Sequence, residues 1–130
     1  MDCIFCKIIK GEIPSYTIYE DDLITVFLDI NPSTNGDCLI VTKEHYENFL
    51  DIPEDLINHI HKISIKIYSI LKEKLNIDGI TLIQNNFYGQ DIKHYHVHLT
   101  PRYKNDKLTH SYNKEDLLEL KKIFEKIKSA

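Results

Sequence analysis

Apolar residues in the first third of the chain fall into short runs separated by polar residues. The runs are rich in β-branched and aromatic residues, which favour strands, and they cover Tyr16–Tyr19, Leu23–Leu28 and Cys38–Val41. The separators are Glu20–Asp22 and Asn31–Gly36, and both consist of residues that favour turns. This pattern predicts three consecutive antiparallel strands.

The spacing of apolar residues changes to that of a helix after residue 54. One stripe recurs every three or four residues and consists of Leu56, Ile60, Ile63, Ile67, Ile70, Leu71 and Leu75. The preceding segment Asp51–Glu54 has the sequence of a capping box, and Asn76 suits a helix end. We therefore expect a long amphipathic helix over 54–75.

Two further strands and a terminal helix are predicted for the rest of the chain. The strands are Gly79–Ile83 and Ile92–Thr100, and the helix covers about 114–128, with Asn113 able to cap it. The expected fold is one α+β domain over residues 1–130. It contains a five-stranded antiparallel sheet, packed by the long helix, and a C-terminal helix.

Three histidines alternate with other residues in the last predicted strand. On extended backbone His94, His96 and His98 point to one face at intervals of roughly 7 Å, while Tyr95 and Val97 face the core. They could be surface histidines of an edge strand, although the strict alternation argues against this. They could instead be ligands of a catalytic metal. In a third interpretation, an unprotonated ring nitrogen attacks phosphorus while its other nitrogen donates a hydrogen bond.

Composition excludes several classes of protein. Hydrophobic residues make up 42% of the chain and charged residues 28%, which is ordinary for a soluble globular domain. The net charge of −4 disfavours broad binding to nucleic acid, although a small nucleotide needs only local positive groups. No apolar run approaches the ~20 residues that span a membrane, and Met1-Asp2-Cys3 does not begin a signal peptide.

The chain has three cysteines, two of them in Cys3-x-x-Cys6. An odd count without a secretion signal favours a reducing compartment, so we expect a cytoplasmic protein. The pair could be redox-active, metal-binding or incidental, and no thioredoxin-like pattern surrounds it. A tetrahedral zinc ion held by this pair needs two more ligands.

The segment Gly89–Arg102, GQDIKHYHVHLTPR, resembles the motif of the histidine triad (HIT) nucleotide hydrolases and transferases. Four other segments fall in the family's order and spacing: Cys3–Ile9, Glu12–Ser15, Phe27–Pro32 and Leu39–His45. The resemblance covers about residues 3–104. It implies a HIT domain, often a homodimer that pairs across the fourth strand and the long helix.

The resemblance also implies a reaction. His96 would attack the α-phosphorus of a dinucleoside polyphosphate or nucleoside phosphoramidate, with an adenine nucleotide expected, and form a nucleotidyl-histidine. His98 would stabilise the leaving group, and His94 would complete the catalytic triad. The alternative is a zinc-stabilised nucleotide-binding adaptor or sensor with little turnover.

In zinc-containing relatives, histidines at the positions of His45 and His94 join the cysteine pair. The resemblance therefore implies that Cys3, Cys6, His45 and His94 hold a structural Zn²⁺. A competing view is that the site is empty and that His94 orients His96 through its backbone.

The resemblance implies that Asp29 binds ribose hydroxyls and that Ile30 belongs to the nucleotide site. Phosphate contacts are expected from the loop that contains Gln84, Asn85, Gly89 and Gln90. Ile4, Ile8 and Ile30 could flank the base or belong to the core.

The chain departs from the family pattern at several positions. Asp37 stands where many members have a fourth histidine, and it could still orient a neighbouring imidazole. Asp91 stands where serine or threonine is usual, and its carboxylate would repel phosphate unless it points away or is protonated. Asn85–Gly89 is one residue shorter than usual, and Thr42 replaces a common proline, with little consequence expected.

Overall fold

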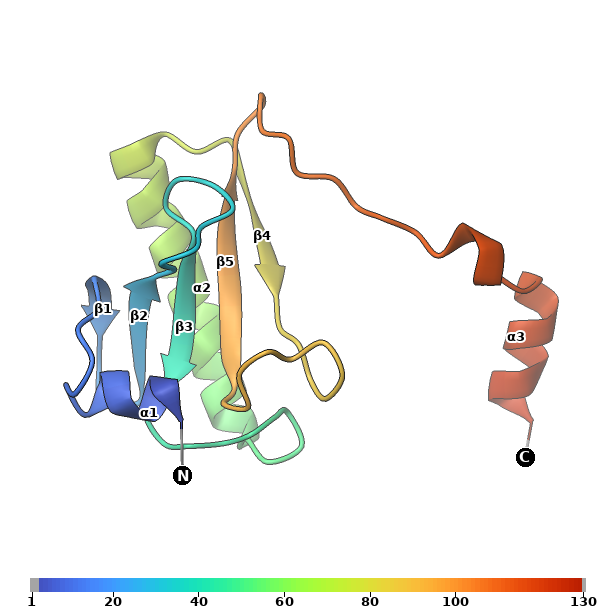
Figure 1. The fold of residues 1–130 in the computed structure, drawn as a ribbon, viewed down its shortest axis with the longest axis horizontal. Coiled ribbons are helices and arrows are strands. Elements are labelled where there is room, and N and C mark those ends of the chain that lie inside the picture. Colours follow the sequence, from blue (N-terminus) through green and yellow to red (C-terminus); the bar gives the residue numbers. More distant parts are fainter. Residues whose placement is uncertain (1–2, 130) are drawn as a thin grey trace.

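A computed structural model describes residues 3–129, and its central element is a five-stranded antiparallel sheet (Figure 1). The strands are β1 (Thr17–Glu20), β2 (Ile24–Leu28), β3 (Cys38–Thr42), β4 (Gly79–Ile83) and β5 (His96–Arg102). They lie in the order β1-β2-β3-β5-β4, so β5 is flanked by strands on both sides. The predicted α+β class and antiparallel sheet are confirmed, whereas residues 1, 2 and 130 of the expected domain lie outside the described residues.

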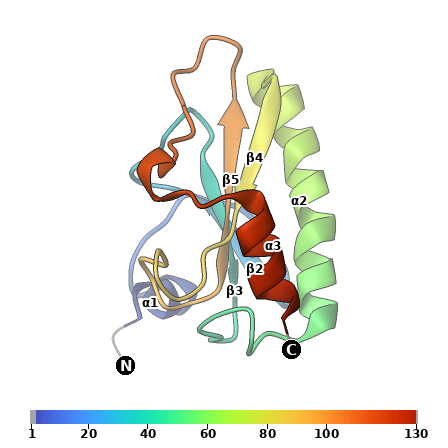
Figure 2. The same cartoon turned by 90° about the vertical axis from the view of Figure 1, so that its right-hand side faces the viewer.

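The long helix α2 (Glu54–Leu75) covers one face of the sheet, with the predicted bounds (Figure 2). Its stripe packs on strand residues in one apolar cluster, which includes Ile24, Ile40, Ile60, Ile63, Ile67, Val97 and Leu99. Each such side chain contributes roughly 1.5–3 kcal/mol when fully buried. Because neighbouring residues of a strand face opposite ways, Val97 and Leu99 pack under α2 while His96 and His98 face the other side.

The other face of the sheet carries a short helix, α1 (Ile4–Ile9), which Figure 2 shows opposite α2. Phe5 from α1 is buried with Phe27, Leu39 and Val41 of the sheet. The sequence did not predict α1, because six residues are too few to show a helical stripe. Cys3 is its N-cap, and the Cys3 sulfur accepts a hydrogen bond from the backbone N–H of Cys6.

The last strand begins later than predicted. β5 starts at His96 rather than Ile92, because its pairing with the neighbouring strands stops there: the last pair with β3 is Val41 with His96, and the last pair with β4 is Ile83 with His98. The capping box at Asp51–Glu54 was also wrong. Pro53 is the N-cap of α2 and none of the described side chains caps the helix, while Asn76 ends it in the left-handed conformation as predicted.

The C-terminal helix is divided into a short 3-10 turn at Lys114–Asp116 and a helix α3 (Leu120–Lys128), and Asn113 makes no side-chain cap. Figure 1 shows the chain after β5 running away from the sheet to α3. The described residues 111–129 are all exposed, so the apolar stripe of α3 has no partner within the described chain. Among the described residues, no helix combines the length and apolar character that crossing a bilayer requires.

Candidate functional site

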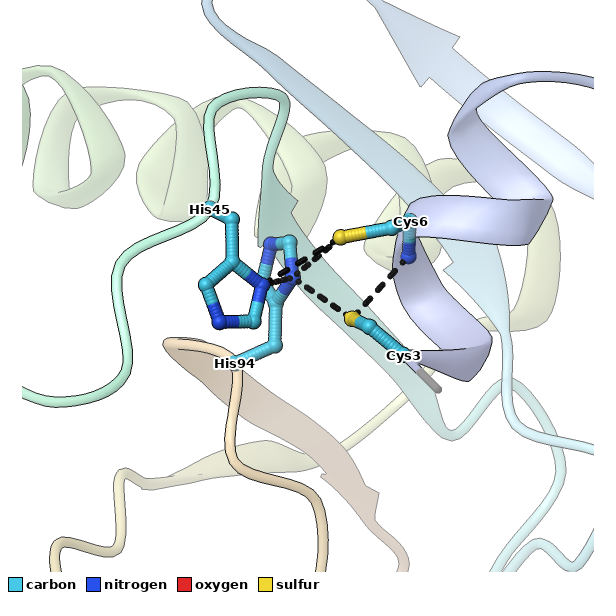
Figure 3. Close-up of side chains that lie close together, drawn as sticks. All are labelled: Cys3, Cys6, His45 and His94. Carbon is cyan, nitrogen blue, oxygen red and sulfur yellow. Dashed lines mark hydrogen bonds between the residues drawn. The ribbon is translucent and has the colours of Figure 1, made fainter. Parts of the chain in front are cut away.

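Four predicted metal ligands gather beside α1 (Figure 3). Cys3 and Cys6 come from α1 and its cap, His45 follows β3, and His94 precedes β5. The Cys3 sulfur lies 3.2 Å from Nδ1 of His94, and the Cys6 sulfur lies 3.2 Å from Nδ1 of His45. The two Nδ1 atoms are 3.1 Å apart. The fold therefore brings together segments that are up to 91 positions apart in sequence.

The His94 ring is oriented so that Nδ1 faces these donors. Its Nε2 lies 2.7 Å from the backbone carbonyl oxygen of Thr42, so Nε2 carries the proton and donates it. A carbonyl partner on the far nitrogen is the usual support of a metal-binding histidine. The sequence did not predict that the Thr42 carbonyl oxygen orients His94, because every residue has a backbone carbonyl and a sequence pattern does not show its contacts.

The spacing of the four donors suits a tetrahedral ion. Zinc bonds of ordinary length separate two nitrogens by about 3.3 Å and a sulfur and a nitrogen by about 3.5 Å. The corresponding separations here are 3.1 Å and 3.2–3.5 Å. Two sulfurs and two imidazoles complete the coordination, so these residues could hold a metal with a structural role.

Burial sets the protonation of two residues of this cluster, Cys6 and His94. Burial, with the hydrogen bond to Cys3, raises the pKa of the Cys6 thiol to about 11. Burial lowers the pKa of His94 to about 4, and the nearby His45 and His96 act in the same direction against the hydrogen bond to Thr42. Cys6 and His94 are therefore neutral near pH 7, and a metal ion that bound here would displace the thiol proton of Cys6.

His96 begins β5, and its side chain is only 2% exposed. Its Nδ1 lies 2.6 Å from the backbone carbonyl oxygen of His94, so Nδ1 is protonated and donates, which leaves the lone pair on Nε2. Burial lowers the pKa of His96, and His98 adds to this effect, whereas that hydrogen bond, Asp91 and Asp29 oppose it. The ring is consequently neutral near pH 7 and held in one tautomer.

The interpretation as surface histidines is wrong, since His94 and His96 are buried. The three rings also do not share one ion, because Nδ1 of His94 faces the cysteines while His96 and His98 line a pocket. The backbone role expected for His94 is compatible with a place in the cluster of Cys3, Cys6 and His45. Its ring joins the cysteine cluster and its carbonyl oxygen fixes the tautomer of His96.

The pocket beside His96 and His98, called here the histidine pocket, has a volume of about 290 Å³. Its polar lining includes Asp29 and Asp91, and its apolar lining includes Ile4, Phe5, Ile8, Phe27, Ile30 and Leu39. The rings of His96 and His98 are 5.0 Å apart and meet edge to face. An apolar chamber with two imidazoles at one wall is suited to a ligand that has a flat apolar part and a reactive polar part.

The predicted nucleotide contacts divide into two groups. Asp29 and Ile30 line the histidine pocket together with Ile4 and Ile8. The loop residues Gln84, Asn85, Gly89 and Gln90 are not part of its lining. Gln84 bonds within its own loop, and the buried Gln90 donates to the carbonyl oxygen of Glu47 at 2.6 Å. A phosphate role for these four residues stays a prediction.

The two unusual aspartates have different surroundings. Asp37 is buried and accepts hydrogen bonds from the Thr100 hydroxyl and the Ser33 backbone N–H, so it orients these groups rather than an imidazole. Asp91 is 71% exposed, and its Oδ1 lies 3.6 Å from Nε2 of His96. The carboxylate at position 91 therefore faces Nε2 of His96 instead of pointing away.

Phe5 was missed as a site residue. Its ring packs edge to face on His96, with the centroids 5.0 Å apart, and on His94 at 5.9 Å. Its position inside Cys3-x-x-Cys6 was the only available signal. Through Phe5, the cysteine cluster (Cys3, Cys6, His45 and His94) and the His96 ring pack together.

Comparison with known proteins agrees with these observations. A family model described as the HIT domain matches residues 10–105. An uncharacterized HIT-like protein of Methanocaldococcus jannaschii is 41% identical over 128 residues, which cover 97% of this chain and 98% of that protein.

Two other similar proteins are named for an activity or for a bound metal. The adenosine 5'-monophosphoramidase HNT1 of Saccharomyces cerevisiae is 37% identical over 102 residues, covering 77% of this chain and 62% of the yeast protein. The crystal structure of a zinc-bound histidine triad protein from Mycobacterium smegmatis matches with a TM-score of 0.80 and 32% identity. That match covers 87% of this chain and 84% of the mycobacterial one.

Proposed function

The chain belongs to the histidine triad (HIT) family, and on this premise we propose that it is a nucleotide hydrolase or transferase acting at an α-phosphate. Its substrates in this proposal are dinucleoside polyphosphates or nucleoside phosphoramidates. The yeast relative named as an adenosine phosphoramidase supports a hydrolase and an adenine nucleotide. Residues 1–130 are proposed to form a single HIT domain.

One observation carries the proposal. The hydrogen bond from Nδ1 of His96 to the carbonyl oxygen of His94 leaves an unprotonated Nε2, and His96 lines the histidine pocket. A neutral imidazole is a good nucleophile at phosphorus and a good leaving group from it. Because the tautomer is fixed by the backbone, no rearrangement is needed before attack.

The proposed reaction has two displacements. Nε2 of His96 forms a bond to the α-phosphorus as the bond from phosphorus to the leaving oxygen or nitrogen breaks. His98, on the same wall of the pocket, supplies the proton that the leaving group takes up. Water or another acceptor then attacks the phosphorus, breaks the bond to Nε2 and releases the nucleotide, and its proton passes to His98.

The nucleoside is placed in the apolar part of the histidine pocket. Ile4, Ile8 and Ile30 would contact the base, and the Asp29 carboxylate would accept hydrogen bonds from the ribose hydroxyls. The position of all four residues on the pocket wall supports this assignment.

Zinc is the proposed ion of the cysteine cluster. The donor set of two thiols and two imidazoles supports it, and so does the similarity to the mycobacterial protein that is described as zinc-bound. When bound, the ion would tie α1 to the segment before β5.

A homodimer in the cytoplasm is also proposed. β4 is an edge strand that presents Leu82 and Ile83 to solvent, which suits pairing with a second copy, and α2 exposes Ile65 and Tyr68. The unpaired state of all three cysteines suits a reducing compartment.

The test is turnover of adenosine 5'-phosphoramidate and of a diadenosine polyphosphate by a His96→Ala variant. Loss of a nucleophile lowers kcat by roughly four orders of magnitude or more. His61→Ala is the matched control, because His61 is an exposed histidine of α2. Turnover by His96→Ala at the wild-type rate would contradict the proposal.

The second candidate function is nucleotide binding with little turnover. The carboxylate of Asp91 beside Nε2 of His96 favours it, because a negative charge there opposes the approach of a phosphate. Calorimetry that shows tight nucleotide binding, together with no product by chromatography, would support this function over the first.

A further inference from the structure

A second group of side chains that could hold a metal ion lies in the histidine pocket, apart from the cysteine cluster. Asp91, His96 and His98 offer one ligand atom each, and these atoms lie within 4.8 Å of one another. Oδ1 of Asp91 is 3.6 Å from Nε2 of His96, which is close to the separation of two ligands on one tetrahedral ion. All three side chains line the same pocket.

Hydrogen bonds within the protein already orient two of the three donors, His96 and Asp91, for binding a cation. Nδ1 of His96 donates to the carbonyl oxygen of His94, so the lone pair of Nε2 faces the pocket, as in a histidine supported for metal binding. Oδ1 of Asp91 accepts the backbone N–H of Ile92 at 2.9 Å, which holds the carboxylate in place. Two imidazoles and one carboxylate form a set that zinc binds while keeping a position open.

The charge of the pocket also favours a cation. Its described lining includes the carboxylates of Asp29 and Asp91 and contains no lysine or arginine. A divalent ion at the three donors would therefore be attracted by two negative charges at close range. The open volume of about 290 Å³ leaves room for water as the remaining ligand.

We propose that Asp91, His96 and His98 form a second transition-metal site, and that a zinc ion bound there inhibits turnover. The ion occupies the lone pair of Nε2, so this nitrogen is no longer available to attack phosphorus. The inhibitory part rests on the proposed function, whereas the metal site itself does not. Asp91 is the residue that creates the site, since a serine or threonine hydroxyl at this position is a poor ligand for zinc.

The experiment uses the full chain carrying one equivalent of zinc, which fills the cysteine cluster. Calorimetry then measures binding of further Zn²⁺ to the wild type, to Asp91→Ser and to a matched control, Asp22→Ser. Asp22 is an exposed acid outside the histidine pocket. Turnover of adenosine 5'-phosphoramidate is followed at the same zinc concentrations.

The wild type and Asp22→Ser are expected to bind a second equivalent, and Asp91→Ser to bind it roughly 100-fold more weakly. Turnover by the wild type falls as the second equivalent binds, and a weak chelator restores it. When Co²⁺ replaces zinc at the second site, its spectrum lacks thiolate-to-cobalt charge transfer, which separates it from the cysteine cluster.

The proposed metal site would be overturned if a second equivalent of Zn²⁺ bound Asp91→Ser as tightly as it binds the wild type. It would also be overturned if the wild type bound no second equivalent. Turnover that rises with the second equivalent would overturn the inhibitory role. If Asp91-dependent binding is measured but no form of the protein turns over nucleotide, the proposed function fails and the metal site stands.

Discussion

Removal of the proposed structural zinc should lower the stability of the whole domain. The four ligands join α1, the loop after β3 and the segment before β5, so unfolding must release the ion. At a free zinc concentration 1,000 times Kd, an ion that binds only the native state stabilises it by about 4.1 kcal/mol. For a chain of this length that corresponds to a fall in Tm of roughly 12–20 °C after chelation.

The assay is thermal unfolding of wild type, Cys6→Ser and Cys38→Ala, each with excess zinc and with chelator. Cys6→Ser removes one ligand and should no longer respond to chelator. Cys38→Ala is the matched control, because Cys38 is a cysteine outside the four ligands and is fully buried in the apolar cluster between α2 and the sheet. It should lose stability from the cavity and yet keep the full response to chelator. If the wild-type Tm does not depend on metal, the four residues stabilise the fold by packing alone and the reasoning is refuted.

Three further predictions concern stability. For Asp21, burial is outweighed by hydrogen bonds from two backbone amides, a histidine and a tyrosine, so its pKa falls to about 2. This carboxylate then contributes about 2 kcal/mol above the unfolded pKa, and the contribution is lost as pH falls toward 2. Urea unfolding should show that Asp21→Asn costs this amount at pH 6 and much less near pH 2; a pH-independent cost would contradict it. Asp37→Asn should cost about 1–3 kcal/mol in the same assay, because the two donors reach different oxygens of the buried carboxylate, and the asparagine NH2 that replaces one oxygen cannot accept a hydrogen bond. Ile67→Ala should cost about 2–5 kcal/mol, whereas Ile65→Ala, on the exposed face of the same helix, should change stability by less than about 1 kcal/mol. Equal costs for these two variants would show that the packed face of α2 is wrongly assigned.

The apolar pattern was sufficient for most of the fold. α2 and β4 have the predicted bounds. α2 has one buried side, and turn-forming residues mark where the two elements begin or end. The start of β5 was not predictable in the same way. Where β5 begins depends on where its pairing with the neighbouring strands stops, and the local sequence around Ile92 does not contain that information.

The candidate site was predictable in its residue types and less so in its geometry. The alternation of His94, His96 and His98 identified residues that the fold places at the cysteine cluster and at the histidine pocket, and Cys3-x-x-Cys6 identified two further members of that cluster. The support of these rings by backbone carbonyl oxygens and by Phe5 depends on tertiary contacts. For the same reason, only the folded chain shows that Asp91 faces Nε2 of His96.

The most direct test of the proposed reaction is to locate a covalent nucleotide on the protein. Wild-type protein is mixed briefly with adenosine 5'-phosphoramidate and quenched in base, in which a phosphorus–histidine bond survives, and the protein is then analysed by intact and peptide mass spectrometry. We expect one adenylyl group per chain, located on His96 and absent from His96→Ala. An adenylyl group on another residue, or active turnover by His96→Ala, would contradict the nucleophilic role of His96.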